Sequence, residues 1–392
     1  MDGKMTNNPE HNDEALKAGG PELPAPDQPE AGRDGTEAAP AKKKRAKKVR
    51  TGPGCLSRTI GVIGIIVLVG LIFAFIAGLK FSNEFLPVEE ASREVVVSIP
   101  EGAGTVRIGQ ILEESGVIKS AEAFNWTMKI KARMNGKPVV LKAGEMALDP
   151  SLPVWKVIDQ VAKGNYKLYP FTVPEGRNMF EIAQMIQNAG LGSKEDFLAL
   201  CRDQSFINSL GLQENTLEGY LFPETYSFPK GTPLKTIIKA MTDSFFNVWK
   251  KYDSLAKEAG MTRHEVVTLA SIVEKETGAA QERPVIAGVF HNRLQKGMKL
   301  QTDPTVVYGL TDFSGTITRK DLNTEHPYNT YIIAGLPPGP ITNPGEAAIS
   351  AVVKPASVSY LYFVSKNDGT HQFSNTLNEH NRAVRQYQRG GK

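Results

Sequence analysis

The stretch "VPEGRNMFEIAQMIQNAGL" (residues 173–191) can be laid without gaps over "IPEGAGTVRIGQILEESGV" (residues 99–117). Each copy has an apolar strand end, a Pro-Glu-Gly turn, apolar residues at helical spacing, and a glycine that ends the helix. The spacing predicts a repeated unit of strand, turn and short amphipathic helix.

The segment between the copies follows the same plan more loosely. Residues 139–165, "VVLKAGEMALDPSLPVWKVIDQVAKGN", predict a strand, a turn, and a helix over 153–163 that stops at Gly164. We therefore expect a small α/β module at 92–168. Units of this kind serve either as binding modules or as spacers that lift a catalytic part off a membrane, and the sequence leaves both open.

Upstream, residues 59–79 read "TIGVIGIIVLVGLIFAFIAGL", without a charge. A helix of this length spans about 31 Å, which matches the apolar core of a bilayer. Seven of the nine residues from Lys42 to Arg50 are basic, so the positive-inside rule predicts that residues 1–58 are cytoplasmic. This tail is rich in Pro, Glu and Gly, and we expect it to be disordered.

The overall composition excludes several classes of protein. The net charge of the 392 residues is +4, and without the seven basic residues it is −3, so a nucleic-acid binder is not expected. Cys55 and Cys201 lie on opposite sides of the apolar segment and cannot form a disulfide within the chain. The six histidines lack the spacing of metal ligands, so neither a metal nor a cofactor is expected.

Beyond residue 211 the sequence predicts a mixed α/β domain that extends to residue 390. Helices are expected at 234–252, 264–277 and 283–294, and a strand at 360–364. The other stretches, among them 300–310, 328–345 and 371–387, read as loops rich in Pro, Asn and Thr, where function concentrates.

The stretch "LEGYLFPETY" (residues 217–226) carries the strongest chemical signal. Glu218 stands at a glycine bend among aromatic residues, where desolvation would raise its pKa towards that of a general acid. The nearby aromatic rings offer flat faces for sugars: Tyr220, Phe222, Tyr226 and Phe228. The alternative is a surface loop with a capping glutamate and core aromatics.

Cleavage of a glycosidic bond usually needs a second carboxylate besides the acid. The candidates are Glu224, Glu274, Glu276 and Asp303. A substrate that carries its own nucleophile needs none, because one glutamate can serve as acid and then as base.

Taken together, five stretches resemble the membrane-anchored endolytic murein transglycosylases of bacteria, the YceG-like family. They are "LEGYLFPETY", "LASIVEKET", "VFHNRLQKGMKLQTDPTVVYGL", "YNTYIIAGLPPGPITNPG" and "YLYFVSKNDGTHQFSNTLNEHN". The resemblance implies that Glu218 is catalytic and that the bond between N-acetylmuramic acid and N-acetylglucosamine is cleaved within peptidoglycan strands, leaving 1,6-anhydro ends. It also implies a LysM-like module at 169–210 and an association with peptidoglycan synthases, the penicillin-binding proteins.

The combined expectation is an α+β protein of a bacterial inner membrane. It has one transmembrane helix, small LysM-like strand-helix modules, and a periplasmic catalytic domain at 211–390. Substrate contacts are expected from Tyr220, Glu274, Gln301, Asp303, Asn329 and Tyr331. Two alternatives remain at this stage: a non-catalytic scaffold that binds glycan, and a hydrolytic glycosidase that uses the same glutamate.

Overall fold

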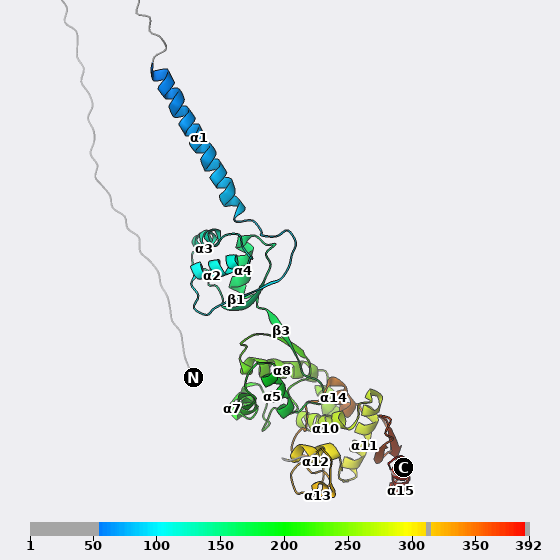
Figure 1. Cartoon of the computed structure of the whole chain (residues 1–392). Helices are drawn as coiled ribbons and strands as arrows, with labels where there is room; N and C mark the ends of the chain where they lie inside the picture. The colour runs from blue at the N-terminus through cyan, green and yellow to red at the C-terminus, as the bar shows by residue number, and fades with distance from the viewer. Residues whose placement is uncertain (1–54, 311–314, 389–392) are drawn as a thin grey trace, which may run out of the picture. The chain divides into compact units, whose positions relative to one another are not determined.

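The structure, a computed structural model, describes residues 55–310 and 315–388. The predicted disordered tail, 1–58, lies outside this range except for its last four residues, which begin the first helix. Helices and short strands are mixed along the described chain (Figure 1), so the predicted α+β content is confirmed. The LysM-like modules and the limits of the catalytic domain stay predictions.

Helix α1, Cys55–Asn83, contains the predicted apolar segment. Within its stretch Ile60–Asn83, an 18-residue window has a mean hydropathy of 3.1, and none of that window is buried against a described part of the chain. Large apolar side chains along it are exposed, among them Phe73 at 71%. A helix that is apolar on every face needs an apolar environment. By length and composition, α1 can cross a membrane.

The first small module combines an antiparallel strand pair with three helices that share one apolar core (Figure 1). Strand β1 pairs with β2 so that Val97 lies opposite Met146, and both side chains are buried. Helix α4 stops at Gly164, which has a left-handed conformation, as predicted. The elements are β1 (Val95–Ile99), α2 (Thr105–Glu114), α3 (Ala121–Asn135), β2 (Gly144–Leu148) and α4 (Val154–Lys163).

The internal repeat is confirmed at the level of backbone and burial. The turn glycines Gly102 and Gly176 have φ angles of 75° and 74°, which favour glycine. Each is followed by a ten-residue helix, α2 or α5 (Met179–Asn188), whose inner face is buried at equivalent positions. The equivalent buried pairs are Ile108 with Ile182 and Leu112 with Ile186.

The remaining part of the chain forms a second, larger apolar core. Strand β3 (Leu168–Thr172) pairs with β4 (Thr225–Pro229). This pairing joins the expected LysM-like module, 169–210, to the expected catalytic domain, 211–390. Strand β5 (Tyr362–Ser365) pairs with β6 (His371–Ser374). The helices after α5 are α6 (Lys194–Leu200), α7 (Gln204–Ser209), α8 (Leu234–Trp249), α9 (Asp253–Glu258), α10 (Arg263–Glu276), η1 (Ala280–Glu282), α11 (Arg283–Gln295), α12 (Asp303–Gly309), α13 (Arg319–Leu322), α14 (Glu346–Val353) and α15 (Leu377–Tyr387).

Helix α10 lies at the centre of this core. All eight residues from Val266 to Val273 are buried, because α11, α12 and α14 pack around the helix. The three helices predicted in this region are confirmed as α8, α10 and α11. The prediction of irregular structure was wrong at residues 303–309 and 371–387, which form α12, β6 and α15. In α12 the proline lies in the first turn, where it is compatible with a helix.

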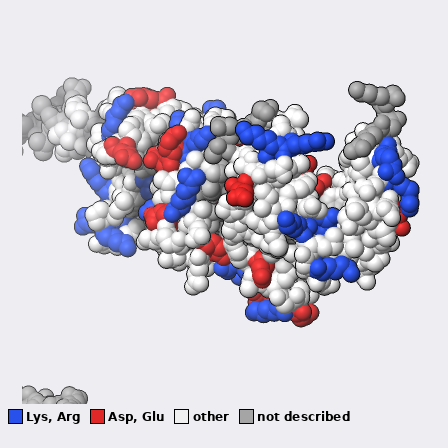
Figure 2. Space-filling model, turned by 90° about the horizontal axis from the view of Figure 1, so that it is seen from below, with Lys and Arg blue, Asp and Glu red and all other residues white. Residues whose placement is uncertain are grey.

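On the face of the molecule shown in Figure 2, basic and acidic side chains are interspersed. Several of them form surface ion pairs, such as Lys239 with Asp243. Exposed pairs of this kind contribute little to stability.

Candidate active site

Glu218 lies at a sharp bend in the chain, and only 1% of it is exposed. The next residue, Gly219, has a φ of +87°, and a Cβ atom there would lie 2.5 Å from Pro340 and 2.7 Å from Val267. Every other residue type would be strained by this φ and blocked by these side chains. Gly219 therefore allows the turn that buries the Glu218 carboxyl group.

Three hydrogen-bond donors hold this carboxyl group. The backbone N–H of Met179, the first residue of α5, lies 3.0 Å from both oxygens. The hydroxyl of Tyr308 on α12 donates to Oε2 at 3.0 Å, and the side-chain amide of Asn343 donates to Oε1 at 3.0 Å. The carboxyl group thus lies at the N-terminus of a helix, where negative charge is favoured.

Burial nevertheless dominates the titration of this group. Desolvation raises the pKa of Glu218 to about 8, and hydrogen bonds from Met179 and Tyr308 offset part of the rise. At neutral pH the side chain is therefore mostly protonated. This is the state that a general acid requires.

Asn343 is fixed in one orientation by the backbone around it. Its Oδ1 accepts the N–H of Leu221 at 2.9 Å, and its Nδ2 also donates to the carbonyl oxygen of Arg177 at 2.9 Å. Because Oδ1 already serves as an acceptor, the NH₂ group must face Glu218. Asn343 is fully buried and links the Glu218 bend to the turn that precedes α5.

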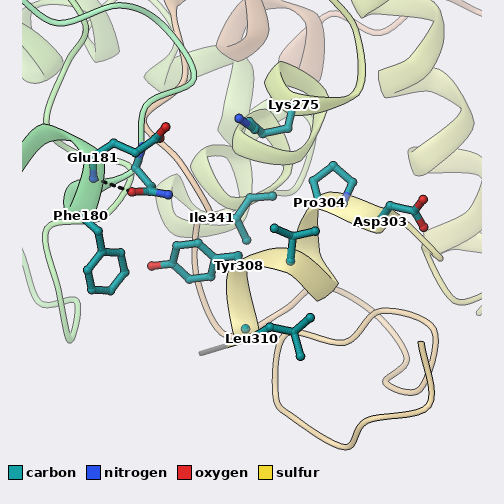
Figure 3. A pocket seen from close by; sticks show the side chains of 11 residues that line it. Phe180, Glu181, Lys275, Asp303, Pro304, Tyr308, Leu310 and Ile341 are labelled. Atoms are coloured by element: carbon teal, nitrogen blue, oxygen red, sulfur yellow. Dashed lines mark hydrogen bonds between the residues drawn. The ribbon is translucent and has the colours of Figure 1, made fainter. Parts of the chain in front are cut away.

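A pocket of about 700 Å³ lies next to Tyr308. In its wall, Phe180 of α5 lies next to Tyr308 of α12, and Pro304 of α12 lines the pocket as well (Figure 3). Lys275 adds a positive charge to its wall, and Glu181 and Asp303 add negative charges. Glu218 does not line this pocket, whereas Tyr308 both lines it and contacts the carboxyl group. Tyr308 therefore connects Glu218 to the pocket.

Three of the predicted substrate contacts lie together in a neighbouring pocket of about 460 Å³, which also contains Glu276. They are Gln301, Asp303 and Tyr331. The Tyr331 hydroxyl donates to Asp303 at 2.7 Å, and Asp303 lines both pockets. Burial raises the pKa of Glu276 to about 7, and the nearby Asp303 adds to the rise.

The other three predicted contacts do not line these two pockets. Tyr220 is fully buried, and its hydroxyl donates to Glu214 at 3.0 Å. Asn329 is fully buried too, and its amide donates to backbone carbonyls, including Thr324 at 2.8 Å. Glu274 forms an ion pair with Arg283 at 2.9 Å. All three stabilise the local structure, because core and loop hydrogen bonds use their polar groups.

The predicted aromatic platforms are also placed differently. Tyr226 and Phe228 are each 7% exposed, because both rings pack into the larger core on β4. Phe180 and Tyr308 provide the aromatic faces at the pocket instead. Within residues 55–310 and 315–388, His, Cys, Asp and Glu form no cluster that is able to hold a metal ion.

Comparison with known families identifies the chain's relatives. The model of the YceG-like family matches residues 97–386, which is most of the chain. The chain belongs to the YceG-like family.

Two curated relatives of this YceG-like chain are named endolytic murein transglycosylase. The protein from Bacillus subtilis (strain 168) is 36% identical over 318 residues, which cover 77% of this chain and 87% of that protein. The protein from Streptococcus pneumoniae serotype 2 (strain D39) is 31% identical over 338 residues, which cover 78% of this chain and 60% of that protein.

The chain is also similar to a solved structure of a YceG-like protein. The 2.6 Å crystal structure of a YceG-like protein from Listeria monocytogenes has 34% identity and a TM-score of 0.52. The match covers 74% of this chain and 99% of that one.

The sequence did not predict the three groups that hold the carboxyl group in this YceG-like protein. Tyr308 and Asn343 lie in stretches that carry the family resemblance, but their residue types gave no sign that they face Glu218. For the N–H of Met179, the only signal in the sequence was the predicted start of a helix. Free N–H groups at a helix start can bind a carboxylate.

Proposed function

We propose that this protein is a membrane-anchored endolytic lytic transglycosylase with Glu218 as its catalytic residue. Its substrate would be the β-1,4 bond between N-acetylmuramic acid and N-acetylglucosamine within peptidoglycan strands. Membership of the YceG-like family and the names of the curated relatives support the reaction class. The observation that carries the proposal is the buried Glu218 carboxyl group, which contacts Tyr308 in the wall of a large pocket and whose pKa burial raises to about 8.

The hydrogen bonds favour one carboxyl oxygen as the proton carrier. Oε1 faces the amide of Asn343, which only donates, whereas Oε2 faces the Tyr308 hydroxyl, which donates or accepts. The proton therefore belongs on Oε2, the oxygen nearer the pocket wall. When Glu218 loses this proton, the three donors stabilise the carboxylate.

The reaction then needs one carboxyl group. Glu218 gives its proton to the glycosidic oxygen as the bond to the muramic C1 breaks, and N-acetylglucosamine leaves with a new hydroxyl. The resulting carboxylate takes the proton of the muramic 6-hydroxyl while that oxygen bonds to C1. This step forms the 1,6-anhydro ring and restores protonated Glu218. Water is not consumed.

We assign substrate contacts to the walls of the two adjoining pockets. Phe180 presents an aromatic face for a sugar ring, and Gln301, Asp303 and Tyr331 offer polar groups for hydroxyl and amide contacts. Because Asp303 borders both pockets, a glycan strand would pass along it. The two units that begin with β1 and β3 are proposed as LysM-like glycan-binding modules, the second around residues 169–210.

The proposed location is a bacterial inner membrane with the catalytic region in the periplasm. The apolar helix α1 and the basic cluster before it support this orientation. An enzyme held there would cut new glycan strands beside the penicillin-binding proteins, and the cut would end the elongation of those strands.

The test is mass spectrometry of the soluble products after incubating the full chain in detergent with purified glycan strands. We expect products that are one water lighter than hydrolysis fragments, and we expect none from Glu218→Gln. The matched control is Glu224→Gln, which alters an exposed glutamate on the same loop and should remain active.

Two outcomes would contradict the proposal. Products of full mass with reducing ends would indicate a hydrolase with a second carboxylate, and loss of activity in Glu276→Gln would then identify it. Binding of strands without any product from the wild-type chain would indicate a scaffold.

A further inference from the structure

Helix α3 has an apolar stripe that no described part of the chain covers. Its inner face packs through Phe124 and Met128, while Trp126, Ile130 and Met134 are 48%, 51% and 80% exposed. These three residues are four positions apart, so they lie along one side of the helix. Three large apolar side chains in a row on a water-facing helix indicate an interaction surface.

The charge around this stripe is strongly positive. Residues 119–142 contain six basic residues and one acidic residue, whereas the chain as a whole has a net charge of +4. Lys129 lies on α3 with its Nζ 5.3 Å from the centre of the Trp126 ring. In the described part of the chain, Lys129, Arg133 and Lys137 have no carboxylate within ion-pair distance. These charges are available to an anionic partner.

The residues just before α3 contact the end of the apolar helix α1. Asn83 is the last residue of α1, and its side chain accepts a hydrogen bond from Lys119 at 3.3 Å, two residues before α3 starts. Phe85 packs against the core of the same module, and its carbonyl oxygen accepts the N–H of Val154 at 3.3 Å. If α1 crosses a bilayer, the N-terminus of α3 lies near the bilayer surface.

We propose that the stripe Trp126, Ile130 and Met134 docks on the surface of the membrane that α1 crosses, and that Lys129, Arg133 and Lys137 contact its anionic lipid headgroups. Exposed Trp and aliphatic residues beside a basic face are typical of helices that lie in a membrane interface. Basic residues next to a span recognise anionic lipids. The inference rests on the proposed membrane span.

The test uses spin labels on the full chain, with Cys55→Ser and Cys201→Ala, in lipid nanodiscs rich in phosphatidylglycerol. Labels at Ile130→Cys and Met134→Cys report the stripe, and a label at Lys239→Cys on the exposed side of α8 is the reference. We expect the ratio of oxygen to nickel-chelate accessibility to be several-fold higher on the stripe than at Lys239.

A charge reversal separates lipid recognition from simple proximity. Lys129→Glu together with Arg133→Glu should lower the ratio at Met134→Cys to the reference value, and nanodiscs of phosphatidylcholine alone should do the same. Lys296→Glu with Lys299→Glu is the matched double reversal outside this module, because both side chains are exposed and have no ion pair within the described residues, and it should leave the ratio unchanged. The four residues substituted in the two double variants are all exposed, so each variant is expected to fold. Circular dichroism checks the folding.

A label at Phe73→Cys tests the span itself, so the two proposals fail in different ways. If Phe73 is buried in lipid but the stripe is as accessible to water as Lys239, docking is refuted and the span stands. If Phe73 is not in lipid, the span fails and docking fails with it. Protection of the stripe by added glycan strands, but not by lipid, would make it a glycan-binding face and would also refute docking.

Discussion

Of the hydrogen-bond donors to Glu218, the Tyr308 hydroxyl is the one that a single substitution removes with the least change to the surrounding packing. Tyr308→Phe keeps the ring between Phe180 and Tyr328, whose centroids lie 6.3 and 4.9 Å away, but removes the donor to Oε2. Loss of a donor to the carboxylate raises the pKa of Glu218 further. We expect the alkaline limb of the kcat/KM profile to move to higher pH. We also expect kcat to fall about tenfold to a hundredfold, the range for a hydrogen bond to a charged group.

The control for this prediction is Tyr328→Phe, which removes a neighbouring hydroxyl that does not bond to Glu218. Its alkaline limb should coincide with that of the wild type. If Tyr308→Phe lowered kcat without moving the limb, Tyr308 would have only a packing role.

At the level of elements, the bend after Glu218 depends on Gly219. Gly219→Ala places a Cβ within 2.7 Å of Pro340 and Val267 at a φ of +87°, so the bend has to shift and Glu218 moves away from its donors. We expect a loss of several kcal/mol of stability and most of the activity. The comparison is Gly231→Ala, where φ is +77° but nothing lies within 4 Å of the new Cβ.

The Gly231 variant isolates the backbone strain, which costs about 1–2 kcal/mol. Chemical denaturation of both variants measures the difference. Equal losses of stability would show that the contacts at Gly219 have no influence.

The elements that sequence reasoning identified are those with local signals. The repeat follows from apolar spacing and its capping glycines, α10 follows from its apolar stripe, and Glu218 follows from its motif. Helix α12 was missed, because Asp303-Pro304 reads as a turn although proline fits the first turn of a helix. Tyr308 was therefore placed in a loop.

The direction of polar side chains was not predictable for a different reason. Asp303 and Tyr331 line a pocket, whereas Asn329, two residues before Tyr331, binds backbone carbonyls inside its own loop. Residue type shows that a side chain forms hydrogen bonds, but not with which partner. Asn343 reaches Glu218 across 125 residues of chain, and no local pattern records that contact.

At the level of the whole molecule, the chain joins an apolar helix to two separate apolar cores. Glu218 and Glu276 both belong to the region of the larger core, and burial raises their pKa values to about 8 and about 7. Their ordinary value is 4.5. The folded region therefore binds these two protons more tightly than the unfolded chain does.

The stability of that region should consequently fall as the pH rises. The contribution of the two groups is fully present below about pH 4.5 and is lost up to about pH 8, at up to about 1.4 kcal/mol per pH unit for each group. We expect the Tm of the corresponding transition to fall between about pH 5 and pH 8. Glu218→Gln should flatten this fall, because glutamine does not titrate, while Glu224→Gln should follow the wild type. Parallel curves for wild type and Glu218→Gln would mean that Glu218 is already ionised in this range, and the proposed acid step would then lose its proton source.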